Sequence, residues 1–116
     1  MNKLRVGICG WGNVATGLFK TLQTNSVEIK KRSNLEIEII AIGARRDNPK
    51  CDPGNVIIER DIFNIIDHDI DVIVELIGGV DVARDLILKA LNAKKHVVTA
   101  NKAVSYTHLT LPTTHD

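Results

Sequence analysis

The sequence predicts an α/β fold in which helices cover both faces of a doubly wound parallel sheet. Short aliphatic runs alternate along the chain with segments of helical periodicity, which is typical of successive strand–helix–strand units. Several of these runs are nearly continuous, as in strands buried on both faces. Aromatic residues make up only 3% of the 116 residues, so the core has to be aliphatic.

The stretch from Val6 to Gly17 predicts a strand, a glycine turn and a helix. Gly10, Gly12 and Ala15 fill the small-residue positions of the pattern G-x-G-x-x-G/A, which in Rossmann-like folds binds the pyrophosphate of a dinucleotide. Gly10 permits a turn that a Cβ atom would obstruct. Gly12 lets a pyrophosphate approach the backbone, and Ala15 lets the helix pack close to the strand. An ordinary strand-to-helix turn is the alternative, but the flanking strand and helix favour nucleotide binding.

The first helix is expected over residues 13–24, where apolar residues recur at helical spacing. The N–H groups of its first turn, around Asn13 and Val14, have no acceptor within the helix and are expected to face the phosphates. Gly17 lies inside this helix, where glycine costs about 1 kcal/mol relative to alanine. We therefore interpret Gly17 as a point of close packing.

A short second helix and a second strand follow. Asn25-Ser26 interrupts the first helix, and a continuation over residues 27–32 ends at Asn34. The three consecutive cations at its end complement the helix dipole; a basic recognition patch is the alternative. Residues 35–44 contain a nearly continuous apolar run, rich in β-branched residues, formed by Ile37, Ile39, Ile40, Ala41 and Ile42; this run predicts a strand buried on both faces.

Two arginines and an aspartate, Arg45, Arg46 and Asp47, come directly after this strand. In doubly wound folds this loop recognises the adenosine ribose. A carboxylate binds the 2′-hydroxyl of NAD, whereas an arginine accommodates the 2′-phosphate of NADP. The guanidinium groups of Arg45 and Arg46 therefore favour NADP, while Asp47 favours NAD. A solvated charged loop is the alternative interpretation.

The middle of the chain alternates loops with short elements. Residues 47–54 form a loop by composition, residues 56–58 are expected to form an edge strand, and Asp61 is expected to cap a short helix. His68 stands among aspartates, but neighbouring side chains in one loop lack the geometry of a dedicated metal site. We therefore expect a solvated turn here, and no metal.

Residues 71–77 predict another buried strand, which Glu75 interrupts. A carboxyl group near the end of a buried strand is costly unless it is paired or hydrogen-bonded, and this end of an open α/β sheet faces the ligand crevice. Gly78-Gly79 follows and allows the backbone to approach a ligand closely. The clearest helical stripe comes next and consists of Val80, Ala83, Leu86, Ile87, Ala90 and Leu91.

The last strand is expected over residues 96–99, where we interpret His96 as a strand-edge residue. Lys102 then stands at the carboxyl end of this strand, on the crevice side. A lysine at this place can touch a phosphate, the nicotinamide amide or a substrate. A solvated residue at the start of a helix is the alternative.

Three motifs in this order resemble those of homoserine dehydrogenases. They are Val6-Gly-x-x-Gly-x-Gly-x-Val14, Asp71-Val-x-Val-Glu-x-x-Gly-Gly79 and His96-Val-Val-Thr-Ala-Asn-Lys102. The resemblance covers residues 3–103, and the last two motifs are more specific than the glycine turn. One departure is Ala15, where most of the family has glycine.

The resemblance implies that residues 1–103 are an incomplete Rossmann-like NAD(P)-binding domain of an oxidoreductase. The family interconverts aspartate 4-semialdehyde and L-homoserine with NAD(P)H, on the way to threonine and methionine. Because of Arg45 and Arg46, we expect NADP to be the preferred cofactor here and NAD to be the other. The resemblance places Gly10, Trp11, Gly12, Asn13 and Val14 along the pyrophosphate, Arg45 and Arg46 near the 2′-phosphate, Gly78 and Gly79 beside the cofactor, and Lys102 at the nicotinamide and substrate end.

The resemblance also implies that the substrate domain, with the principal acid/base lysine, is absent from this chain. We therefore expect the chain alone to be inactive, and the full-length parent to be a homo-oligomer that acts on a small molecule. Two alternatives stay open. One is another NAD(P)-dependent semialdehyde or amino-acid dehydrogenase with a similar first half, and the other is a stand-alone NAD(P)-binding module.

The stretch from residue 104 to residue 116 has no helical periodicity. Residues 104–113 resemble the translation of a transposase-library sequencing adapter. We therefore expect residues 104–116 to be a non-native tail, in which His108 and His115 have no function. A divergent natural tail is the alternative.

Composition excludes some partners. The formal net charge is +1, so neither a nucleic-acid nor a membrane partner is expected. No apolar stretch reaches the length of a transmembrane helix. Cys9 and Cys51 form neither a C-x-x-C pair nor a metal-ligand spacing, which is typical of a protein in the reducing cytoplasm.

Overall fold

A parallel sheet runs through the structure, with the strand order β3-β2-β1-β4-β5. The computed structural model describes residues 2–49, 51–77 and 81–100. The order is that of a six-stranded dinucleotide-binding sheet up to its fifth strand, so the predicted fold class is confirmed. The strands are β1 (Asn2–Cys9), β2 (Leu35–Gly43), β3 (Ile57–Glu59), β4 (Val72–Glu75) and β5 (His96–Thr99).

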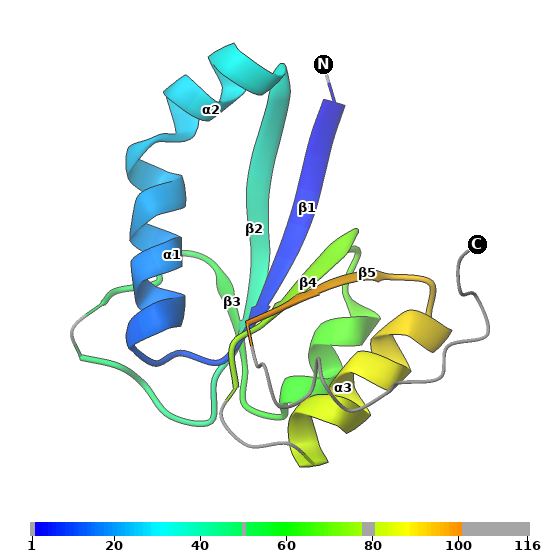
Figure 1. Ribbon diagram of the computed structural model, residues 1–116. Coiled ribbons are helices and arrows are strands. Elements are labelled where there is room, and N and C mark those ends of the chain that lie inside the picture. The colour runs from blue at the N-terminus through cyan, green and yellow to red at the C-terminus, as the bar shows by residue number, and fades with distance from the viewer. Residues whose placement is uncertain (1, 50, 78–80, 101–116) are drawn as a thin grey trace.

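The helices lie on both faces of this sheet (Figure 1). They are α1 (Asn13–Thr24), α2 (Ser26–Ser33), the short 3₁₀ helix η1 (Ile62–Asp67) and α3 (Asp81–Asn92). The face toward α1 buries Val6, Ile8 and Ile42 with Ala15 and Phe19. The face toward η1 and α3 buries Cys9, Ala41 and Ile73 with Ile65, Leu86 and Ala90. Among the described residues the buried core is mainly aliphatic, as predicted from the composition, with Trp11 and Phe19 as aromatic members.

The predicted bounds of α1 are confirmed at both ends. Gly12, in an extended conformation, precedes the helix, and Asn25 ends it. The chain then continues into α2, which ends at Asn34 with a left-handed φ of 56°. The interpretation of Gly17 was wrong: it is exposed, and a Cβ added there would meet no atom within 4 Å. Close packing therefore does not explain this glycine.

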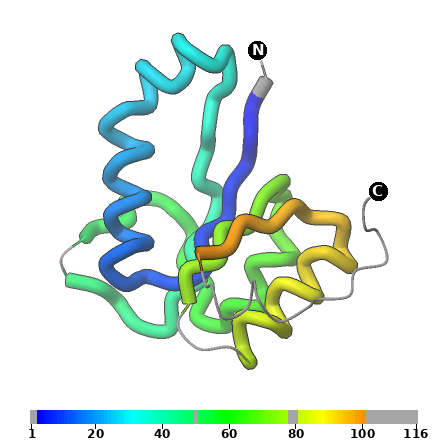
Figure 2. Tube along the Cα trace, in the orientation of Figure 1, coloured from blue at the N-terminus to red at the C-terminus, as the bar shows by residue number. Residues whose placement is uncertain are grey.

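The burial predicted for β2 is correct only at its carboxyl end. Residues 41–43 are buried, whereas Glu36 and Glu38 are exposed. The first half of β2 extends with β1 beyond the rest of the sheet (Figure 2), so no helix of the α3 side covers it. A register shift in the pairing with β1 makes Ile40 an extra residue. A bulge of this kind changes the face to which the following side chains point.

The middle of the chain forms the edge strand and the short helix that were predicted. β3 pairs only with β2 among the described strands, and the Asp61 side chain accepts a hydrogen bond from the Phe63 N–H at 3.1 Å at the start of η1. His68 contacts Glu59 at 2.6 Å instead of the neighbouring aspartates. Within residues 2–49, 51–77 and 81–100, no group of three or more potential metal ligands is found.

The stripe predicted for the last helix is confirmed over α3. Ala83, Leu86, Ile87 and Ala90 are buried, whereas Val80 lies outside the described residues. After α3, His96 begins β5 and is exposed, in agreement with its interpretation as a strand-edge residue. None of the described helices has the length and apolar character needed to cross a membrane.

Candidate cofactor site

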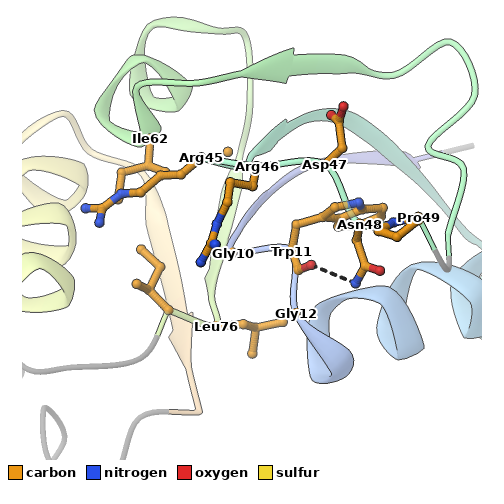
Figure 3. Close-up of a pocket in the computed structure, with 12 residues that line it drawn as sticks. Gly10, Trp11, Gly12, Arg45, Arg46, Asp47, Asn48, Pro49, Ile62 and Leu76 are labelled. Atoms are coloured by element: carbon orange, nitrogen blue, oxygen red, sulfur yellow. Dashed lines mark hydrogen bonds between the residues drawn. The ribbon is translucent and has the colours of Figure 1, made fainter.

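A cleft of about 480 Å³ opens where β1, β2 and β4 end (Figure 3). Its volume falls within the range of about 300–1,000 Å³ that is common for ligand sites. The chain leaves β1 toward β2 and β3 and returns on the other side of β1 to form β4, so the cleft lies where open α/β sheets bind their ligands. The lining residues are Gly10, Trp11, Gly12, Gly43, Arg45, Arg46, Asp47, Asn48, Pro49, Ile62, Leu76 and Ile77.

Gly10 makes the sharp turn at the end of β1. Its φ is +108°, and a Cβ atom there would lie 2.7 Å from the Leu76 carbonyl oxygen. Its N–H donates to the Gly43 carbonyl at 2.8 Å. A side chain at this position would therefore both strain the backbone and clash with it, which confirms the predicted reason for the first glycine.

The second glycine leaves open space in front of α1. A Cβ at Gly12 would meet no atom within 4 Å, and the Thr16 N–H donates to the Gly12 carbonyl at 2.9 Å. The N–H groups of Asn13 and Val14 come before this bond and have no acceptor within the helix. Neither residue is among the described residues that line the cleft, and the Val14 side chain is 67% exposed. Their contact with a pyrophosphate stays a prediction.

Trp11 lines the cleft and also belongs to the core below it. Its ring packs edge-to-face on Phe19, with the centroids 5.4 Å apart. The Trp11 carbonyl accepts a hydrogen bond from Asn48 Nδ2 at 3.0 Å (Figure 3). Asn48 thus joins the loop after β2 to the glycine turn.

Arg45 and Arg46 line the cleft from the loop after β2. Both side chains are exposed. In Figure 3 the Arg46 side chain extends toward Gly10, whereas the Arg45 guanidinium lies on the side of Ile62. Neither arginine has an ion pair with another described residue. Two guanidinium groups at the rim of a cleft suit a phosphate group, which they can bind in bidentate fashion.

The acidic residue of the same loop has a partner. Arg60, just after β3, donates from Nη2 to Asp47 Oδ1 at 2.5 Å and from Nη1 to the Ala44 carbonyl at 3.2 Å. The Asp47 carboxylate points away from the Arg46 guanidinium in Figure 3. The loop therefore presents mainly positive charge to the cleft.

Glu75 lies at the end of β4, under the β4 side of the cleft, and is completely buried. Its Oε2 accepts from the Ile77 N–H at 2.7 Å, and its Oε1 accepts from the Thr99 hydroxyl. The Glu75 carboxyl group is thus hydrogen-bonded through both oxygens, as the sequence analysis required of a buried carboxyl group. The Cys9 thiol lies on the neighbouring strand, where burial, and secondarily the negative charge of Glu75, raises its pKa from 9.0 to about 12.

Part of the predicted site lies outside the described residues, namely Gly78, Gly79 and Lys102. Sequence reasoning missed Asn48 and Arg60. Asn48 was predicted only as part of a loop and Arg60 was given no role, because nothing in the local sequence shows that Asn48 reaches Trp11 or that Arg60 reaches Asp47.

A parallel sheet with a glycine turn at its switch point, followed by a helix start and an arginine pair, defines a dinucleotide-binding domain of the Rossmann class. A sequence model of the family described as "Homoserine dehydrogenase, NAD binding domain" matches residues 10–111. The chain belongs to this family. The resemblance in the three motifs is thereby confirmed.

Relatives and solved structures agree with this assignment. The chain is 50% identical over 109 residues to a homoserine dehydrogenase of Pseudomonas aeruginosa, covering 93% of this chain and 25% of the relative. It is 41% identical to one from Methylobacillus glycogenes, covering 90% of this chain and 26% of that protein. The chain thus spans about a quarter of the length of the curated relatives it matches.

Two crystal structures show the same fold. A homoserine dehydrogenase from S. aureus at pH 6.0 superposes with a TM-score of 0.78 and 34% identity, over 88% of this chain and 27% of that one. The homoserine dehydrogenase from Thiobacillus denitrificans also gives a TM-score of 0.78, with 36% identity over 89% of this chain and 24% of that one.

Proposed function

We propose that this chain is the part of a homoserine dehydrogenase that binds NADP(H), and that its parent interconverts aspartate 4-semialdehyde and L-homoserine. The observation that carries the proposal is the cleft itself, where the glycine turn and the arginine pair meet in a chain of this family. The fit of a dinucleotide is supported by the open space in front of Gly12, which follows the tight turn that Gly10 makes possible.

Each part of the cleft has a place in this proposal. The backbone from Gly10 to Val14 holds the pyrophosphate, and Arg45 and Arg46 hold the 2′-phosphate of the adenosine half. Arg60 supports the preference for NADP, because it engages the carboxylate of Asp47, which would otherwise favour the 2′-hydroxyl of NAD. NAD is the second, weaker cofactor.

The parent's chemistry needs more than this chain. The bound nicotinamide supplies or accepts the hydride, and protein groups have to orient the carbonyl and stabilise the developing alkoxide. We assign Gly78 and Gly79 to the surroundings of the cofactor and Lys102 to a supporting role at its nicotinamide end. The principal acid/base lysine belongs to a substrate domain of the parent, so the chain alone is expected to bind cofactor without turnover.

Binding of NADPH and NADH to the chain tests this proposal. Trp11 is the single tryptophan and lines the cleft, so its fluorescence reports the titration. We expect tighter binding of NADPH, and loss of this preference when Arg45 and Arg46 are both replaced by alanine. A variant with Lys30 and Lys31 replaced by alanine removes the same charge from α2, outside the described lining of the cleft, and should keep the preference.

Equal affinities for NADPH and NADH, or a preference that survives loss of both arginines, would contradict the NADP assignment. Reduction of aspartate 4-semialdehyde by the full-length parent tests the substrate. Turnover by the isolated chain would contradict the assignment of the principal acid/base lysine to a substrate domain of the parent.

We further propose that the parent is a cytoplasmic homo-oligomer. Size measurement of the parent in solution checks its assembly.

A further inference from the structure

We propose that Glu75 is a positioning residue which ties the carboxyl ends of β4 and β5 together and so fixes the wall of the cleft beside the nicotinamide half of the cofactor. This inference rests on the proposed function and deepens it. Glu75 is not among the described residues that line the cleft, so it acts through the backbone that follows it.

The burial of Glu75 requires an explanation. Its side chain is 0% exposed, and it lies beside Cys9 on β1 and Thr99 on β5 in the register of the sheet. A buried carboxyl group loses the hydration that it has in the unfolded chain, and this loss is costly unless hydrogen bonds replace it. An aliphatic residue at this position would avoid the cost, as Ile73 does two residues earlier on the same side of β4.

The two carboxyl oxygens contact two different strands. Oε2 accepts from the Ile77 N–H at 2.7 Å, beyond the end of β4, and Oε1 accepts from the hydroxyl of Thr99, the last residue of β5. The Glu75 carbonyl accepts in addition from the Ala100 N–H at 3.3 Å. Glu75 therefore holds the chain at the point where both strands end.

The position of this tie relative to the cofactor follows from the cleft. Arg45 and Arg46 lie after β2, which places the 2′-phosphate and the adenosine half on that side, and the glycine turn after β1 takes the pyrophosphate. The rest of the dinucleotide then extends toward β4, where Leu76 and Ile77 line the cleft. The residue that Glu75 holds directly, Ile77, thus belongs to the nicotinamide side.

Binding of two probes to the 116-residue chain separates positioning from simple stabilisation. NADPH carries both halves of the cofactor, whereas adenosine 2′,5′-bisphosphate carries only the adenosine half. Glu75→Leu removes both hydrogen bonds, and Thr99→Val removes only the link to β5. Glu75→Gln keeps both, since its oxygen can accept from Ile77 and its amide can donate to Thr99. Ile73→Ala is the matched control, because it weakens the core of the same strand without touching the tie.

We expect Glu75→Leu to raise the Kd for NADPH by about tenfold, equivalent to ~1.4 kcal/mol, with the Kd for the bisphosphate nearly unchanged. Thr99→Val should also raise the Kd for NADPH, by a smaller factor, and leave the Kd for the bisphosphate nearly unchanged. Glu75→Gln should bind both probes like the unaltered chain. The emission of bound NADPH, which reports the surroundings of the nicotinamide, should change in Thr99→Val and not in Ile73→Ala.

Two results would overturn the inference. One is unchanged NADPH binding and emission in Thr99→Val, a variant that keeps the size of the side chain and so tests the tie even if Glu75→Leu fails to fold. The other is an equal loss of affinity for NADPH and for the bisphosphate in the Glu75 and Thr99 variants, as a general loss of stability would cause. Failure of the unaltered chain to bind either probe would overturn the proposed function, and the role of Glu75 with it.

Discussion

Arg60 and Asp47 form a short ion pair, with Nη2 and Oδ1 2.5 Å apart, that joins the end of β3 to the loop after β2. The same guanidinium donates to the Ala44 carbonyl at 3.2 Å. Both side chains are largely exposed, so the pair contributes little to global stability. Its effect is local: it holds the carboxylate of Asp47, a residue that lines the cleft, on the side away from the Arg46 guanidinium.

Replacing Arg60 with alanine is expected to weaken NADPH binding relative to NADH. Without its partner, the Asp47 carboxylate is free to turn toward the cleft, where it repels a 2′-phosphate and accepts a hydrogen bond from a 2′-hydroxyl. We expect the ratio of the two Kd values to shift by about threefold to tenfold, the scale of a charge–charge interaction of ~1 kcal/mol in water. Fluorescence titration of Trp11 measures both constants.

The control for this prediction is Arg60→Ala combined with Asp47→Asn. Removal of the negative charge should restore most of the NADPH preference. If the double variant shows the same loss as Arg60→Ala alone, the charge of Asp47 is not the cause.

Gly10→Ala is expected to destabilise the fold. The residue has a φ of +108°, and its new Cβ would lie 2.7 Å from the Leu76 carbonyl oxygen. Strain of this kind costs about 1–3 kcal/mol, which urea unfolding can measure. Gly17→Ala is the matched control: it adds the same methyl group to open space inside a helix, and it should stabilise by about 0.5–1 kcal/mol. Equal effects at the two positions would refute this explanation.

Gly12→Ala should separate binding from stability. A Cβ at Gly12 meets no protein atom within 4 Å, so the free energy of unfolding should change by less than about 0.5 kcal/mol, as is usual away from packed sites. In the proposed binding mode, the methyl group stands where the pyrophosphate approaches the backbone. We expect NADPH binding to weaken by about tenfold, or ~1.4 kcal/mol. An unaltered Kd would show that the phosphates do not pass this glycine.

The buried Cys9 thiol should make stability decline at alkaline pH. Burial, with a smaller contribution from the charge of Glu75, raises its pKa from 9.0 to about 12. The folded state then keeps the proton over a pH range in which the unfolded state releases it, so the stabilisation is complete below pH 9 and is lost as pH rises toward 12. The slope is at most ~1.4 kcal/mol per pH unit.

Urea unfolding at pH 8 and pH 10 checks this expectation, with Cys9→Ala as the reference. The free energy of unfolding should fall more between the two pH values in the unaltered chain than in Cys9→Ala. Parallel declines would show that other groups cause the alkaline loss.

Local signals in the sequence were sufficient for most elements. Gly12 and Asn25 mark the two ends of α1, and the apolar stripe of α3 has a clear helical period, so these helices were predicted closely. The order of strands and helices was enough for the fold class, because parallel strands with helical crossovers have few possible arrangements.

Features that depend on neighbours distant in sequence were not predicted. The extra residue at Ile40 arises from the register between β1 and β2, and the exposure of Glu36 depends on which elements cover the sheet. Within the candidate site, the sequence singled out Arg46 and Glu75 but not their surroundings. The contacts of Arg60 with Asp47 and of Glu75 with Thr99 cross from one element to another, so no local pattern contains them.

The central place of β1 has a consequence for how this domain is synthesised and folds. β1 pairs in parallel with β2 on one side and with β4 on the other, and parallel pairs cannot be closed by a tight turn. A nascent chain that has reached Gly43 contains the β1–β2 unit with the glycine turn, but one edge of β1 lacks its partner. That edge stays open to pairing with other chains until Val72 has been made. The slow, long-range step of folding is therefore expected to be the arrival of β4, and the side of the cleft formed by the loop after β2 is made before the side formed by the end of β4.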